Sequence, residues 1–109
     1  MIEHKGVFYY SCTEIAKMIN QPDEDFKSVS DKFHQVYSKG YVYDSYVQKK
    51  LYPAAEKKYI RYIKYQKKGP KVYKAFAVAD LLDFLNRKDA RNIEFDISSV
   101  RNIEIVEKI

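Results

Sequence analysis

The sequence predicts a small α+β domain, and three features support this fold class. The chain has 109 residues, a length that suits one domain with a single hydrophobic core. Apolar residues recur at helical spacing between residues 11 and 40 and again after residue 79. Between them lies a stretch rich in β-branched and aromatic residues with a Gly-Pro turn, which is typical of two paired strands.

The first helix is expected to begin at Ser11, in the stretch SCTEIAKMIN. Ser11 and Glu14 have the spacing of a capping box, in which each side chain accepts a hydrogen bond from the other residue's backbone amide. Ile15, Met18 and Ile19 then fall on one face. The pattern therefore predicts an amphipathic helix that ends before the following Pro22.

A second helix is expected to start near Asp25, after the break that Pro22 introduces. Its apolar residues recur at spacings of three and four, and Gly40 is placed to end it in a left-handed conformation. These apolar residues are Phe26, Val29, Phe33, Val36 and Tyr37. The result is two short helices separated by a tight turn.

The stretch between Gly40 and the basic segment is less informative. Residues 41–48 alternate weakly, and Pro53 suits the first turn of a further helix. Residues 57–66 fit either a strand or a helix that runs from Pro53 to Lys67. The turn in KKGPK and the strand-like VYKAFAV after it favour a β-hairpin with a basic tip.

A third helix is predicted by the stretch ADLLDFLNRK, which returns to helical spacing and ends in basic residues. We expect Leu82 of this helix to be buried in the core together with Ile15 and Phe33.

The remaining tail contains a short repeat, RNIEF at residue 91 and RNIEI at residue 101, each alternating apolar and charged residues. It predicts a terminal hairpin over residues 91–109, which is also a candidate dimer contact. The rest of the single domain is expected to form a core that spans residues 8–90.

Composition limits the classes of function. Cys12, His4 and His34 are the chain's only cysteine and histidines, fewer than a structural zinc site requires. No motif around Cys12 indicates a nucleophilic thiol. The chain also lacks an apolar run of about 18 to 20 residues and a secretion signal. We therefore expect a cytoplasmic protein that is not an enzyme and needs no cofactor, metal or membrane.

The positive charge is concentrated in one block. Residues 49–74 contain ten basic residues and one acid, Glu56, whereas the stretches before and after this block each contain five basic residues and seven acids. Such a concentration favours a polyanionic partner. The block lacks the wide apolar face of a helix that lies on a membrane, so nucleic acid is the preferred partner.

The order of the expected elements is that of winged helix-turn-helix domains, and two stretches carry a resemblance to a family. YYSCTEIAKMIN resembles the opening of MerR-like and phage excisionase-like DNA-binding domains, where a capping Ser or Thr precedes E-I/V-A-K. KVYKAFAVADLLDFLNRK resembles their close, where a wing strand leads into D-L-x-x-F-L. The resemblance implies a winged helix-turn-helix that binds double-stranded DNA, as a transcriptional regulator or a recombination or architectural factor, often as a homodimer.

The chain departs from this family at the start of the second helix. Family members usually carry a set such as S-x-x-T-V/I-R there, whereas this chain has DEDFKSVSDKF. Asp23, Glu24 and Asp25 thus stand where DNA would approach.

The implied mechanism divides between two elements. Cations of the wing would neutralise DNA phosphates, and side chains of the second helix would read base edges. The wing residues are Lys57, Lys58, Arg61, Lys64, Lys67, Lys68, Lys71 and Lys74, and the residues of the second helix are Lys27, Ser30, His34 and Gln35.

Two other functions stay open. The acidic start of the second helix suits a protein-interaction module, for instance a phage-encoded inhibitor of a host protein. Alternatively, Tyr59, Tyr62 and Tyr65 alternate with Arg61 and Lys64, an arrangement of rings and cations that suits single-stranded DNA or RNA.

Overall fold

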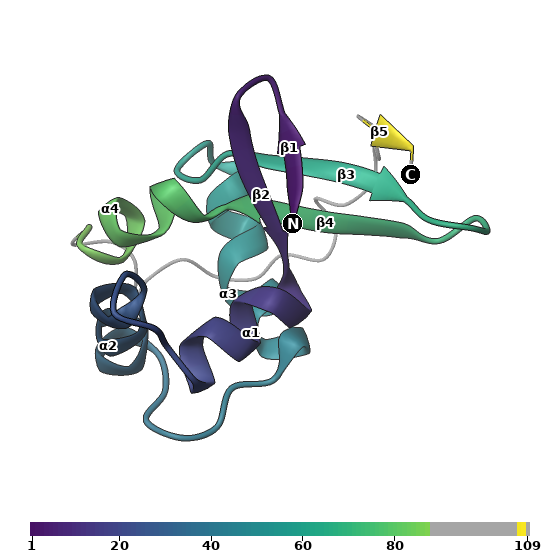
Figure 1. Ribbon diagram of the computed structural model, residues 1–109. Coiled ribbons are helices and arrows are strands. Elements are labelled where there is room, and N and C mark those ends of the chain that lie inside the picture. Colours follow the sequence, from purple (N-terminus) through teal and green to yellow (C-terminus); the bar gives the residue numbers. More distant parts are fainter. Residues whose placement is uncertain (88–106, 109) are drawn as a thin grey trace.

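The computed structural model describes residues 1–87 and, for the backbone alone, residues 107–108. Helices and a β-sheet form one α+β unit, so the predicted fold class is confirmed at this level (Figure 1). In chain order the elements are β1 (Ile2–His4), β2 (Val7–Ser11), α1 (Cys12–Asn20), α2 (Lys27–Val36), α3 (Asp44–Glu56), β3 (Tyr62–Gln66), β4 (Val72–Ala77), the 3-10 turn η1 (Val78–Asp80), α4 (Leu81–Leu85) and β5 (Glu107–Lys108).

The strands form one sheet in the order β1-β2-β4-β3-β5. All neighbours are antiparallel except β3 and β5, which run parallel. The hairpin β1–β2 was not predicted from the sequence. Its two-residue turn places Lys5 at φ 51° and Gly6 at φ 80°, the left-handed pair of a type I′ turn. A glycine in this turn was its main sequence signal, and β1 is too short to show a clear alternation.

Helix α1 confirms the predicted capping box. The amide of Glu14 donates to Ser11 Oγ over 3.2 Å, and the amide of Ser11 donates to Glu14 Oε1 over 3.1 Å. Ile15 and Ile19 are buried, as their helical spacing predicts.

Helix α2 is shorter than predicted at both ends. It begins at Lys27 rather than near Asp25, because Asp23 Oδ1 accepts the amide of Phe26 and closes a turn before the helix. It ends at Val36, with Tyr37 as its C-cap, so Gly40 lies beyond it. Gly40 also lacks a positive φ, and the predicted glycine cap is therefore wrong.

Helix α3 fills the stretch that the sequence left open. It runs continuously from Asp44 to Glu56, with Pro53 near its C-terminal end, so the expectation that Pro53 opens a helix is wrong. The helix starts earlier because Val47 and Leu51, four residues apart, are buried on its inner face.

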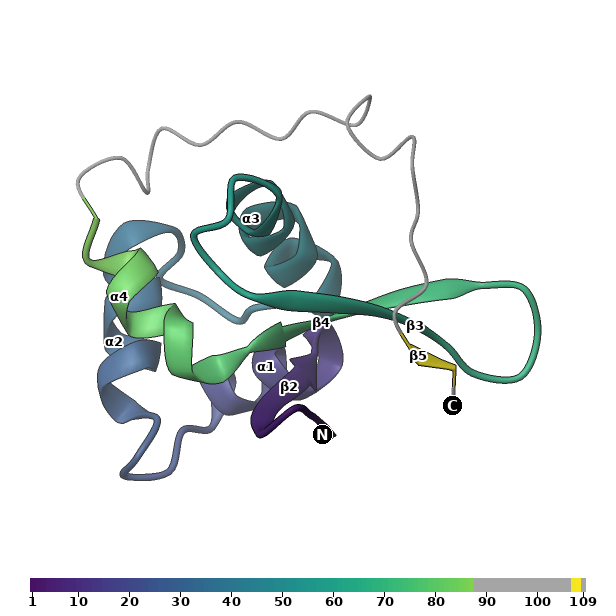
Figure 2. The ribbon, with the colours of Figure 1, turned by 90° about the horizontal axis from the view of Figure 1, so that it is seen from above.

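The predicted hairpin is confirmed, and a helix from Pro53 to Lys67 is excluded. Strands β3 and β4 pair in the register Tyr62↔Phe76 to Gln66↔Val72. Their hairpin projects away from the helices at one side of the molecule (Figures 1 and 2). Residues 57–61 lie in the connection from α3 and not in a strand.

The main core lies between the helices and the sheet. Ile15 and Phe33 are buried as predicted, with 0% and 1% of their surfaces exposed. Leu82 is only half-buried, because Leu81, Phe84 and Leu85 form the inner face of α4. The predicted tail hairpin at 91–109 lies outside the described residues, apart from the pairing of β5 with β3.

Candidate nucleic-acid interface

The tip of the β3–β4 hairpin, residues 67–71, carries three exposed lysines. Gly69 adopts φ 98°, which a glycine accommodates without strain, and Gln66 Nε2 donates to the Pro70 carbonyl over 3.1 Å. These features close a turn that presents Lys67, Lys68 and Lys71 to solvent.

Tyr73 organises two of the tip lysines. Lys67 Nζ lies 5.2 Å and Lys71 Nζ 5.1 Å from the centroid of its ring, within the range of cation–π attraction. The Tyr73 ring in turn stacks on Tyr65, with centroids 5.6 Å apart. Lys67 and Lys71 therefore lie beside the ring of Tyr73, which stacking on Tyr65 holds in place.

Lys64 and Lys74 do not belong to this exposed set. They are direct partners in the β3–β4 register, and Lys64 is only 5% exposed. Lys74 Nζ lies 4.5 Å and Lys64 Nζ 5.8 Å from the ring centroid of Tyr52 in α3. Burial and, secondarily, the charge of Lys64 lower the pKa of Lys74. The prediction that Lys64 contacts phosphate directly is wrong, because its ammonium is enclosed under the helix.

Arg61 has a structural partner. Its Nε and Nη2 donate to the two carboxylate oxygens of Asp80, and its backbone amide donates to Asp80 Oδ2, each over 2.9 Å. The hydrogen bonds and charge of Asp80 raise the pKa of Arg61. This bidentate pair ties the start of β3 to η1. The Arg61 guanidinium, which was predicted to bind a DNA phosphate, is therefore already bonded to the Asp80 carboxylate.

Lys57 and Lys58 are exposed but lie before β3, on the far side of this five-residue strand from the hairpin tip. A strand of that length spans about 17 Å. The two lysines end α3 in a Schellman motif, in which the amides of Lys58 and Tyr59 donate to the carbonyls of Ala55 and Ala54. Lys58 occupies the left-handed position of this motif, with φ 66°. The predicted wing cations thus divide into tip, base and interior groups.

The predicted contacts of the second helix divide in the same way. Lys27 and Gln35 are exposed. Ser30 is 2% exposed and its hydroxyl donates to the Ile19 carbonyl over 2.7 Å, so the prediction that it reads bases is wrong. His34 is half-buried and its Nδ1 bonds to the Ser38 carbonyl at the end of α2. Because Nδ1 is engaged, His34 could contact a base only through the Nε2 side of its ring.

Helix α2 and the hairpin tip lie at opposite ends of the molecule in both views (Figures 1 and 2). Asp23, Glu24 and Asp25 are exposed in the turn before α2. The two predicted DNA-contacting elements therefore do not converge on one compact site, and the end that carries α2 also carries the acids.

The tyrosines predicted to stack on nucleic-acid bases are used for packing. Tyr65 is 3% exposed. Tyr62 packs against the rings of Tyr52 and Phe76, and Tyr59 stacks on Phe84 with the Arg87 guanidinium 3.9 Å from its centroid. No continuous exposed stripe forms from Tyr59, Tyr62 and Tyr65.

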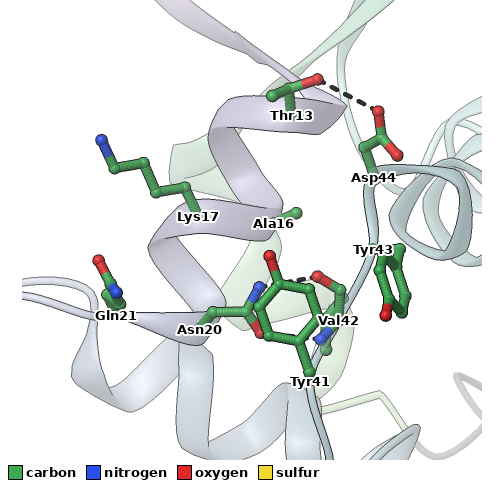
Figure 3. Close-up of a pocket in the computed structure, with 9 residues that line it drawn as sticks. All are labelled: Thr13, Ala16, Lys17, Asn20, Gln21, Tyr41, Val42, Tyr43 and Asp44. Atoms are coloured by element: carbon green, nitrogen blue, oxygen red, sulfur yellow. Dashed lines mark hydrogen bonds between the residues drawn. The ribbon is translucent and has the colours of Figure 1, made fainter.

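Two exposed tyrosines lie elsewhere, in the linker between α2 and α3. Tyr41 is 70% and Tyr43 66% exposed, and their rings meet edge to face with centroids 4.9 Å apart. They border a hollow of about 410 Å³ between the linker and α1 (Figure 3). The alternation of YVYD, with an apolar residue between two tyrosines, was the one sequence signal for this pair.

The part of the chain that the structure describes offers neither a metal site nor a membrane-spanning helix. Within it, no cluster of three or more His, Cys, Asp or Glu side chains is suited to a metal ion. The described helices are also too short or too polar to cross a bilayer.

Comparisons with known proteins found no relative. A scan against protein-family models gave no match, and searches of the curated proteins and of the solved structures gave none either. The resemblance to MerR-like and excisionase-like domains therefore stays a prediction.

Proposed function

We propose that the chain is a non-enzymatic DNA-binding protein that uses the β3–β4 hairpin as a wing on the phosphate backbone of a duplex. The observation that carries this proposal is the hairpin tip, where Lys67, Lys68 and Lys71 are exposed on a projecting turn. No acidic residue occurs anywhere between Lys57 and Lys74. A projecting element whose own residues include several cations and no acid attracts a polyanion and releases its counterions on contact.

The hairpin contacts phosphates and not base edges in this proposal. Lysine is a flexible point charge, whereas specific base reading usually relies on groups that bond in a bidentate manner. Arg61 is the one arginine of the hairpin region and Asp80 already holds its guanidinium. Binding by the tip is therefore expected to depend strongly on salt and weakly on DNA sequence.

Helix α2 has the smaller role. With Ser30 buried and His34 bonded to Ser38, Lys27 and Gln35 are the predicted contacts that keep exposed side chains. The acids before this helix repel phosphates. These features favour an architectural or recombination factor over a sequence-reading regulator. In this proposal α1, α2 and the hairpin are the elements of a winged helix-turn-helix, and the hairpin makes the main contact with DNA.

Salt-dependent binding tests this function. The affinity of a labelled duplex is measured by anisotropy for wild type, for Lys67→Gln with Lys68→Gln, and for a control with Lys5→Gln and Lys39→Gln. Both variants remove two exposed lysines and change the net charge equally. The tip variant should flatten the slope of log K against log salt by about 1.8, or 0.9 for each lost phosphate contact. The control should match wild type.

Two results would reject the proposal. One is a tip variant that binds the duplex as the control variant does, and the other is wild-type protein that binds no duplex at low salt. A further variant, Lys27→Gln with Gln35→Ala, measures the share of α2. We expect it to lose less affinity than the tip variant.

A protein-interaction module is the second candidate, and the exposed acids before α2 favour it. Asp23, Glu24 and Asp25 form a negative turn that suits a basic partner protein. Replacing all three with Asn separates the candidates. A DNA-binding protein should gain nonspecific duplex affinity because repulsion is removed, whereas an interaction module should show no duplex binding before or after the change.

A further inference from the structure

The exposure of Tyr41 and Tyr43 is imposed by the fold. Val42 lies between them, 1% exposed, and the Asn20 side chain holds its backbone on both sides. Asn20 Nδ2 donates to the Val42 carbonyl over 2.7 Å, and the Val42 amide donates to Asn20 Oδ1 over 2.8 Å. Because successive residues of an extended segment point in opposite directions, anchoring Val42 inward turns both neighbouring rings to solvent.

The hollow beside this tyrosine pair lies next to one that the hairpin lines. It shares Thr13 and Asp44 with a second hollow of about 580 Å³, which the hairpin residues Lys67 and Lys71 also line. A third, of about 590 Å³, adjoins this second hollow at Cys12 and Asp44. We call the three together the α1 groove, because residues of α1 line each of them.

The α1 groove is cationic. Five lysines line it against two carboxylates, Glu14 and Asp44. Glu14 Oε1 accepts the amide of Ser11 at the start of α1. Asp44 accepts hydrogen bonds from the Thr13 hydroxyl and the Ser45 amide, and its bond to Thr13 spans the groove (Figure 3). The five lysines are Lys17, Lys49, Lys67, Lys71 and Lys74.

We propose that the α1 groove binds an unpaired segment of a nucleic-acid strand, with phosphates at the hairpin lysines and bases stacked on Tyr41 and Tyr43. This inference rests on the proposed function, since the hairpin tip serves both. A cationic groove that ends in exposed aromatic rings is the arrangement by which proteins hold single strands. Bases inside a duplex are already stacked on each other, so only an unpaired base can offer its face to the tyrosine pair.

The test compares two ligands that differ only in their bases. One is a labelled oligothymidylate of about 12 nucleotides, and the other is the same backbone with abasic sites throughout. Tyr41→Ala with Tyr43→Ala is expected to weaken binding of the oligothymidylate about 5- to 140-fold, the range for losing stacking on one base. Binding of the abasic strand and of a duplex should be unchanged.

The control is Tyr41→Phe with Tyr43→Phe, which keeps both rings and should retain the wild-type affinity for the oligothymidylate. Unchanged duplex binding by the alanine variant also shows that it is folded. The inference is overturned if the alanine variant binds the oligothymidylate as wild type does, or if it loses the abasic strand equally. The proposed function survives either result provided that the tip variant still lowers duplex affinity, so the two failures are distinguishable.

Discussion

Replacing Ser30 with Ala tests whether this side chain is structural, as its contacts indicate. Ser30 Oγ donates to the Ile19 carbonyl over 2.7 Å and the residue is 2% exposed. Ile19 lies in the last turn of α1, where carbonyls lack a partner within the helix. The hydroxyl of α2 therefore satisfies a carbonyl of α1 that is shielded from water.

The expected loss follows from this geometry. Leaving a buried acceptor without its donor costs about 1–3 kcal/mol, while the higher helix propensity of alanine returns about 0.5 kcal/mol. We expect Ser30→Ala to lower the free energy of unfolding by about 0.5–2.5 kcal/mol. For a domain of this size that corresponds to a fall in Tm of roughly 2–20 °C.

Urea unfolding followed by circular dichroism measures this loss, with Ser28→Ala as the matched control. Ser28 is on the same helix and is exposed, so its replacement should change stability by less than about 0.5 kcal/mol. Equal stability of the two variants would refute the structural role of Ser30. Folded Ser30→Ala should also bind DNA as wild type does, and a loss of base discrimination without a loss of stability would restore its predicted contact with bases.

Three further outcomes are expected. Lys58→Gly should raise the free energy of unfolding by up to about 1 kcal/mol in urea melts, because glycine adopts a positive φ without strain; a loss of stability would contradict this. Hydrogen bonds from Arg61 lower the pKa of Asp80 from 3.8. Asp80→Asn should therefore destabilise at pH 7, and its difference from wild type in melts should shrink as the pH falls through the lowered pKa; a difference that persists at the lowest pH would exclude the pair. Burial and the charge of Asp44 raise the pKa of Cys12 to about 12. A thiol reagent should therefore modify Cys12 far more slowly at pH 8 in the folded chain than in the unfolded chain. Equal rates would contradict this.

Local patterns predicted local structure well. The capping box at Ser11 and Glu14 involves residues three apart, and the turn at Gly69 involves adjacent ones, so the sequence contains all the partners. Helix α3 and the hairpin β1–β2 were missed because their signals are weak locally. Val47 and Leu51 reveal α3 only by their burial in the core.

The candidate site was predicted less well, because exposure depends on distant segments. The sequence alone located the cationic block and the hairpin that carries it. It could not show that Asp80, nineteen residues away, holds Arg61, or that α3 places Tyr52 over Lys64 and Lys74.

The dependence of exposure on distant segments also explains why some tyrosines are exposed and others are not. From the sequence, Tyr59, Tyr62 and Tyr65 and the pair at Tyr41 and Tyr43 are equivalent aromatic residues. Packing against other elements buries Tyr65 and half-buries Tyr59 and Tyr62, whereas hydrogen bonds to Asn20 hold Val42 inward and expose the pair. Composition and short-range spacing thus determined the fold class, the first helix, the hairpin and its charge. Which side chains reach solvent was decided by the tertiary structure, because burial is set by contacts between segments that are far apart in the chain.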